Sequence, residues 1–62
     1  AVVDEYIGKD VSAAQRQIQR AGLRPEIMEI NHPTIKAGEV ILQAPQEGTT
    51  LRKNDVVVLT VS

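Results

Sequence analysis

The stretch Asp10–Leu23, DVSAAQRQIQRAGL, decides the fold because it reads as one amphipathic helix with a signal at each end. Its apolar residues recur at three- and four-residue spacing and form one stripe, which consists of Val11, Ala14, Ile18 and Ala21. Asp10 is a helix N-cap residue, whose side chain accepts hydrogen bonds from unpaired backbone N–H groups. Gly22 supplies the left-handed position after the helix, and Leu23 folds back onto the last turn. These signals predict a helix over residues 11–21.

Three strand candidates follow this helix. Residues 25–30 form the weakest, because Pro25 cannot donate to a strand ladder and therefore starts the strand or lies at an edge. Residues 39–44 are bounded by a glycine and a proline. Residues 56–62 form the strongest candidate because they are rich in β-branched side chains. Val2-Val3, before the helix, is a candidate for a short extra strand.

The length of the chain places these elements in one small domain. A domain of 62 residues buries only about 60% of the surface that its unfolded chain exposes. We therefore expect a single domain over residues 1–62 of the α+β class, in which the helix packs on a small three-stranded antiparallel sheet. A core this thin does not enclose a deep, dry catalytic pocket, which typically needs about 300 Å³ or more.

The composition excludes several classes of protein. Tyr6 is the only aromatic residue, so the chain lacks the rings on which many nucleic-acid modules stack bases. Seven basic residues face eight acidic ones, whereas a phosphate-binding surface usually shows a basic excess. There is no cysteine for a disulfide or a thiolate metal site, and the longest apolar run, Val56 to Leu59, is too short to span a membrane. Because the sequence begins at Ala1 rather than at methionine, we expect a piece of a longer protein, which would reach a membrane only through its parent chain.

The residues that could carry catalysis are few and poorly placed. His32 is the only histidine and precedes Pro33 in an expected loop, so we interpret it as a solvated loop residue. Asp4-Glu5 are adjacent and point apart, and Glu26 and Glu29 differ by three positions, which puts them on opposite faces of a strand. One histidine with carboxylates does not make a convincing zinc site. The sequence therefore predicts no catalytic residue, no metal site and no cofactor.

Six features match one known module in their order and approximate spacing. They are Gly8 before the helix cap, Ala14 in the helix, Ala21-Gly22-Leu23 at its end, Gly38–Pro45 as G-x-V-x-x-Q-x-P, Gly48 three residues after that proline, and Val57–Ser62 as the closing V-x-L-x-V-S. Together they resemble a PASTA repeat, the small module of penicillin-binding proteins and bacterial Ser/Thr kinases, over essentially the whole chain. Val3 departs from this pattern, since the family usually has proline there, and Asn54 stands where glycine often precedes the last strand.

The resemblance implies a location and a class of ligand. PASTA repeats lie on the extracellular face of the cytoplasmic membrane, often in tandem, as non-catalytic parts of a kinase or a transpeptidase. They are thought to recognise peptidoglycan fragments, muropeptides or lipid-linked cell-wall precursors, and some contact β-lactams. Other repeats act as spacers or pack against a transpeptidase domain or neighbouring repeats.

The stem peptides of muropeptides carry carboxylates, which cationic side chains bind through charge-assisted hydrogen bonds. We therefore predict that Arg20, Arg24, Arg52 and Lys53 bind ligand. The alternative for the arginines near the helix end is a solvated helix face. A repeat without ligand would be a spacer or docking module, and the sequence leaves both functions open.

Overall fold

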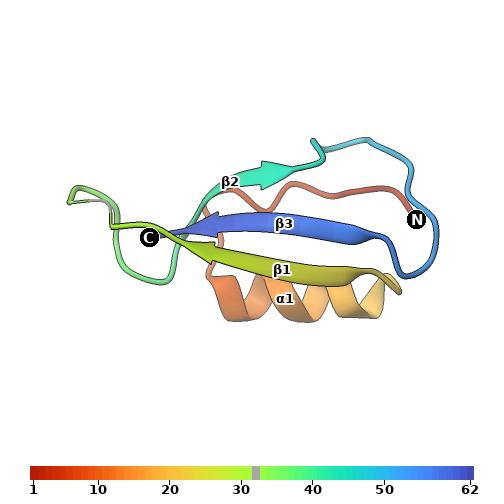
Figure 1. Cartoon of the computed structure of the whole chain (residues 1–62), viewed down its shortest axis with the longest axis horizontal. Helices are drawn as coiled ribbons and strands as arrows, with labels where there is room; N and C mark the ends of the chain where they lie inside the picture. The colour runs from red at the N-terminus through yellow and green to blue at the C-terminus, as the bar shows by residue number, and fades with distance from the viewer. Residues whose placement is uncertain (32) are drawn as a thin grey trace.

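Residues 1–31 and 33–62 form one helix and three strands, in the order that the sequence predicts (Figure 1). In the computed structural model, which describes these residues, α1 spans Val11–Arg20 and β1 spans Arg24–Glu29. Strand β2 spans Val40–Ala44 and β3 spans Val56–Val61. Each bound lies within one residue of the prediction, and the α+β class is confirmed.

The helix α1 begins and ends at the residues that the sequence marks. The Asp10 carboxylate accepts a hydrogen bond from the Ser12 N–H at 3.1 Å, which makes Asp10 the N-cap. Gly22 has a φ of +81°, and the Leu23 N–H donates to the Ile18 carbonyl at 3.1 Å. This bond reaches back over the end of the helix as in a Schellman motif, so the predicted termination is confirmed.

The sheet is mixed, which corrects the expected antiparallel arrangement. Strand β3 lies in the middle of the order β1-β3-β2, and it runs parallel to β1 and antiparallel to β2. The chain reverses direction between β1 and β2 and again between β2 and β3. When the third strand then inserts between the first two, it must run parallel to the first. The sequence indicates the strands and the turns but not the lateral order of the strands in the sheet. This order determines whether β3 pairs with β1 in parallel or antiparallel fashion.

Pro25 lies in an edge strand, as its missing N–H predicts. The Arg24 N–H donates to the Asp55 carbonyl at 2.9 Å, and the Ile30 N–H donates to the Val61 carbonyl at 2.8 Å. In a parallel ladder, alternate residues bond to the same neighbour, so Pro25 faces the free edge of β1. A proline there leaves no ladder hydrogen bond unmade.

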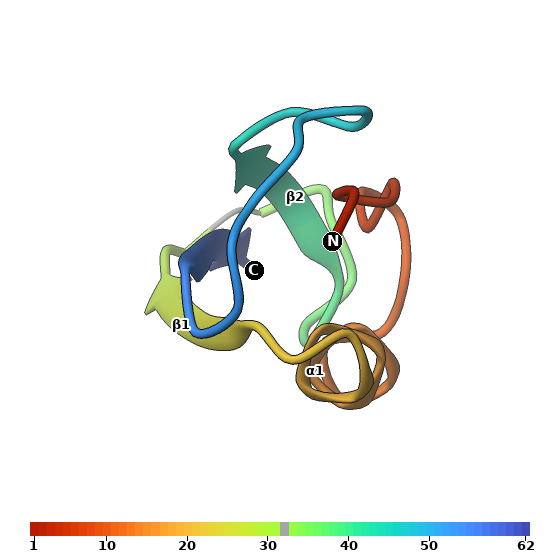
Figure 2. The ribbon, with the colours of Figure 1, turned by 90° about the vertical axis from the view of Figure 1, so that its right-hand side faces the viewer.

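The core lies between the sheet on one side and the helix with the N-terminal residues on the other (Figure 2). Its buried side chains come from all of these parts and are Val3, Tyr6, Ala14, Ile18, Leu23, Val40, Val57, Leu59 and Val61. Strand β3 contributes three of them at alternate positions, which explains why the most β-branched strand is the central one. Tyr6, the only aromatic residue, is 1% exposed and therefore serves the core rather than a binding surface.

The N-terminal segment (residues 1–10) runs beside the stretch 38–51. The extra strand expected at Val2-Val3 is reduced to a single bridge between Val2 and Thr50. A second bridge joins Asp10 to Glu39 at the other end of the segment. The segment therefore covers the side of β2 that β3 leaves open.

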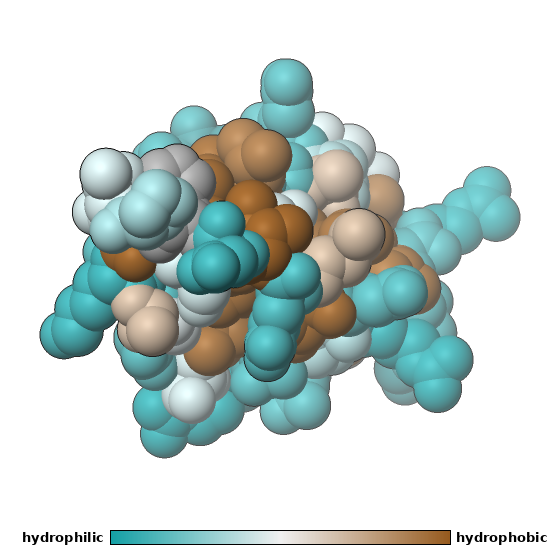
Figure 3. Space-filling model, turned by 60° about the vertical axis from the view of Figure 1, so that its left-hand side comes forward, coloured by the Kyte–Doolittle hydropathy of each residue, from teal (hydrophilic) through white to brown (hydrophobic). Residues whose placement is uncertain are grey.

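The outer face of the sheet, opposite the helix, is covered by no element of the described chain. The register places Met28, Thr60 and Leu42 in one row across it. Met28 and Leu42 are more than half exposed, and Figure 3 shows hydrophobic atoms reaching the surface between hydrophilic ones. Within the described residues, no helix has the length and apolar character needed to cross a membrane.

Candidate functional site

The four predicted ligand residues lie at one end of the molecule. Arg20 is the last residue of α1, and Arg24 is the first residue of β1. Arg52 and Lys53 lie in the turn that leads into β3. Figure 1 shows the end of the helix and the starts of β1 and β3 at the same end of the long axis. We call the four residues the basic end.

Contacts hold the two parts of the basic end together, namely the end of α1 with the start of β1, and the turn before β3. The Asn54 N–H donates to the Gly22 carbonyl at 2.7 Å, directly beside the helix terminus. Lys53 packs over Gly22, because a Cβ on that glycine would lie 3.6 Å from the Lys53 Cγ. Asn54 has a φ of 70°, a conformation that asparagine tolerates better than most residues. The turn can therefore close without the glycine that the family often has there.

The basic end carries an uncompensated positive charge. Residues 20–24 and 52–55 contain four cationic side chains and one carboxylate, that of Asp55. The Asp55 carboxylate accepts a hydrogen bond from the Arg52 backbone N–H at 2.9 Å. In the described part of the chain, none of the four cationic side chains forms an ion pair or a hydrogen bond, and all four residues are exposed. These groups are therefore free to bind an anion.

A second site is a cleft between the N-terminal segment and β2. At one end, the Val3 N–H donates to the carbonyl of Thr49, in the turn that follows β2, at 2.8 Å. At the other end, the Gly8 N–H donates to the Val40 carbonyl at 2.9 Å. Between these ends, residues 4–7 form no backbone hydrogen bond to β2 within the described chain. The two strands of chain therefore separate in the middle.

The Gln43 side chain bridges this separation. Its Oε1 accepts a hydrogen bond from the Tyr6 N–H at 2.7 Å, and its Nε2 donates to the Asp4 carbonyl at 2.9 Å and the Pro45 carbonyl at 3.3 Å. Both amide hydrogens of Nε2 are therefore engaged. The glutamine of the G-x-V-x-x-Q-x-P pattern thus spaces the two parts of the chain at a fixed separation.

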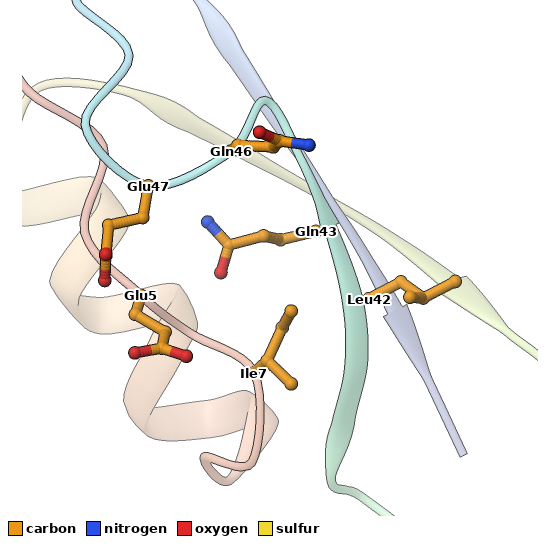
Figure 4. Close-up of a pocket in the computed structure, with 6 residues that line it drawn as sticks. All are labelled: Glu5, Ile7, Leu42, Gln43, Gln46 and Glu47. Atoms are coloured by element: carbon orange, nitrogen blue, oxygen red, sulfur yellow. The ribbon is translucent and has the colours of Figure 1, made fainter.

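The space beside this bridge is a cleft of about 320 Å³. Its lining residues are Glu5, Ile7, Leu42, Gln43, Gln46 and Glu47 (Figure 4). In the view of Figure 4, the Glu5 and Glu47 side chains lie on one side of Ile7 and the Leu42 side chain lies on the other. The sequence does not reveal this cleft, because its lining comes from stretches about 40 positions apart and only Gln43 is a fixed position of a recognisable motif.

A Ser–His–Asp triad would need His32 together with Ser12 or Ser62, the only two serines of the sequence. Ser12 lies in the first turn of α1, and the Ser62 hydroxyl donates to the Ile35 carbonyl at 3.0 Å. His32, which the sequence suggests is a solvated loop residue, lies outside the described residues. Across residues 1–31 and 33–62, no three His, Asp or Glu side chains gather into a group that could hold a metal ion.

Comparison with known proteins decides the family. The family model described as the PASTA domain matches residues 1–62, the whole chain. The chain belongs to the PASTA-domain family. The resemblance in the sequence motifs is therefore confirmed. No curated protein sequence matches this PASTA domain.

Two solved structures share the fold of this PASTA domain. One is the crystal structure of the three-PASTA-domain of a Ser/Thr kinase from Staphylococcus aureus, with a TM-score of 0.81 and 22% identity. The other is the entire extracellular region of the Ser/Thr kinase PrkC from the same organism, with a TM-score of 0.81 and 23% identity. The matches cover 98% and 97% of this chain but only 31% and 22% of those chains. The PASTA domain therefore spans less than a third of the length of each of those chains.

Proposed function

We propose that this PASTA domain is a non-catalytic module on the extracellular face of the cytoplasmic membrane, where it weakly recognises carboxylate-bearing cell-wall fragments. These fragments are peptidoglycan pieces, muropeptides or lipid-linked precursors. The parent chain would be a bacterial Ser/Thr kinase or a penicillin-binding transpeptidase. The structural neighbours support this setting, since one of them is the extracellular region of a Ser/Thr kinase.

The single observation that carries the proposal is the convergence of the basic end. Arg20 and Arg24 stand four positions apart and Arg52-Lys53 about 30 positions later, yet all lie beside the bond between Asn54 and Gly22. Four cations without partners attract anions, and arginine matches the planar geometry of a carboxylate.

The same geometry predicts low affinity. An exposed ion pair contributes only about 0–1 kcal/mol, because water and salt screen both charges. The basic end is an open surface, so a single domain is expected to bind a carboxylate ligand at millimolar concentration. Tandem domains facing a polymeric wall would gain affinity by avidity, since the second contact forms at a high effective concentration.

An NMR titration with muropeptides of defined stem peptide tests this function. The backbone amides of Arg20, Arg24, Arg52 and Lys53 are expected to shift at millimolar ligand, and the shifts should weaken as salt is added. The double variant Arg24→Gln with Lys53→Gln should reduce the affinity several-fold. Arg16→Gln is the control. Like each substitution in the double variant it removes one positive charge, but from a part of the helix surface outside the basic end, so it should leave the affinity nearly unchanged.

Two results would contradict the proposal. One is the absence of any shift at millimolar muropeptide. The other is an equal loss of affinity in Arg16→Gln, because net charge rather than the basic end would then account for binding.

A second candidate function is that of a spacer, and the shape of the domain favours it. The molecule measures 35 × 17 × 15 Å, and its two chain ends lie toward opposite ends of the long axis (Figure 1). Copies joined in tandem would therefore extend in a line. Small-angle scattering on one, two and three linked copies should show a maximum dimension that grows by nearly the long axis per copy. A compact dimension that grows far more slowly would exclude the spacer.

A further inference from the structure

We propose that the cleft between the N-terminal segment and β2 binds an aliphatic primary ammonium group. This site is separate from the basic end and takes a ligand group of the opposite charge. Its residues are those that line the cleft, with Glu5 and Glu47 as the charged ones. The proposal does not depend on the proposed function, because no residue of the basic end lines the cleft.

The hydrogen-bonding groups of the cleft suit a pure donor. The Glu5 and Glu47 carboxylates are exposed, and neither has a hydrogen-bond or ion-pair partner among the described residues. Gln43 offers no free N–H, because both of its amide hydrogens are already engaged with backbone carbonyls. Apart from the Gln46 amide, the free polar side-chain atoms of the cleft are therefore acceptors. An ammonium group has three donors and no acceptor, so it matches this set.

An ammonium group fits better than a guanidinium. The two carboxylates come from separate stretches of chain, one from the N-terminal segment and one from the turn after β2. A guanidinium forms its strongest contacts as a planar fork against a single carboxylate. The three donors of an ammonium group rotate freely and need no common plane, so they suit acceptors that come from two separate stretches of chain.

The apolar part of the cleft suits an unbranched carbon chain. Ile7 is 46% exposed and Leu42 is 58% exposed, so both leave aliphatic surface at the cleft for a ligand to cover. In Figure 4, Ile7 lies between the carboxylates and Leu42. A ligand with its ammonium at Glu5 and Glu47 would therefore lay its carbon chain over Ile7 toward Leu42. A volume of about 320 Å³ is at the small end of ligand pockets, which matches a side-chain-sized group.

The cleft is held open before any ligand binds. Backbone hydrogen bonds join its two walls at both ends, and Gln43 spans the gap with three hydrogen bonds. Little ordering of the chain is then needed on binding, which removes one of the usual costs of association.

Titration of the chain with three small probes, followed by backbone amide shifts, tests the proposal. The probes are pentylammonium, Nα-acetyl-lysine methylamide and neutral 1-pentanol. Both ammonium probes should shift the amides of Glu5, Ile7, Leu42 and Glu47, and 1-pentanol should bind about tenfold more weakly because it lacks the charge. Binding of the lysine derivative without pentylammonium would contradict the proposal, because the ammonium and its alkyl chain would then not be enough for recognition. Equal binding of both ammonium probes would support the proposal, because the ammonium group and its alkyl chain are then sufficient for binding.

Variants separate the cleft from general electrostatic attraction. The double variant Glu5→Gln with Glu47→Gln should weaken ammonium binding about tenfold, since two exposed charge contacts are lost. Glu26→Gln, on strand β1 and away from the cleft, should leave the affinity unchanged. Leu42→Ala should weaken the binding of pentylammonium more than that of methylammonium, a fourth probe that has the charge without the carbon chain. The proposal is overturned if 1-pentanol binds as tightly as pentylammonium, if Glu26→Gln matches the double variant, or if the shifts lie outside the cleft.

Discussion

Gln43 shows how one side chain can define a surface. Its carboxamide bonds to the Tyr6 N–H and the Asp4 carbonyl on the N-terminal wall of the cleft, and to the Pro45 carbonyl directly after β2. The sequence motif marks this glutamine as a family residue but does not say what it contacts. Only the folded chain reveals that its partners lie 37 and 39 positions away.

Gln43→Glu is expected to destabilise the domain by about 1–3 kcal/mol. The substitution keeps the acceptor for Tyr6 but replaces the donor by an oxygen that faces the Asp4 and Pro45 carbonyls. Urea unfolding measures the loss. Gln46→Glu makes the same chemical change on an exposed side chain without a partner in the described chain and should cost less than about 0.5 kcal/mol. Equal losses in the two variants would show that the bridge contributes nothing.

At the scale of the element, both ends of the helix α1 lie where local sequence signals predict them. The N-cap at Asp10 and the left-handed Gly22 lie where the sequence predicts them. Both depend on bonds within a few residues, so their neighbours in the sequence are also their neighbours in space. The termination has a second consequence, because the Gly22 carbonyl accepts the Asn54 N–H and so positions one half of the basic end.

Gly22→Ala is expected to cost about 1–2 kcal/mol, through backbone conformation rather than through a clash. The new Cβ would meet only the Lys53 Cγ, at an ordinary contact distance of 3.6 Å, whereas a φ of +81° is costly for any residue with a Cβ. Thermal unfolding by circular dichroism measures the effect. Gly22→Asn should lose less, because asparagine tolerates the left-handed region. A larger loss in Gly22→Asn than in Gly22→Ala would point to crowding instead.

The pairing of the strands is a feature that local sequence signals do not predict. Pro25 correctly indicates an edge strand, because its missing N–H is a property of one residue. The parallel pairing of β1 with β3 has no such local mark. This parallel pairing results from the position of β3 between β1 and β2, two strands that run in opposite directions.

At the scale of the whole molecule, the core is thin and each buried side chain carries a large share of the stability. A domain of 62 residues has a free energy of unfolding of roughly 3–9 kcal/mol, at about 0.05–0.15 kcal/mol per residue. Leu59 is fully buried in the central strand, and no disulfide is available to compensate for its loss.

Leu59→Ala is therefore expected to remove about 2–5 kcal/mol and to leave much of the protein unfolded. The chemically identical change Leu42→Ala should cost under about 1 kcal/mol, because Leu42 is 58% exposed and leaves no cavity. Chemical denaturation followed by far-ultraviolet circular dichroism measures both. Similar stabilities for the two variants would contradict the assignment of Leu59 to the core.

The helix, its two ends, the three strands and the family can all be predicted from the sequence, because they depend on side chains and backbone conformations close together along the chain. The sequence also indicates four cations as candidates. Three features emerge only when the chain is folded: the four cations share one end, the sheet is mixed, and Glu5 and Glu47 line the same cleft. Each of these depends on contacts between residues some 30 to 40 positions apart, and such contacts are set by the order and packing of the elements rather than by any local pattern.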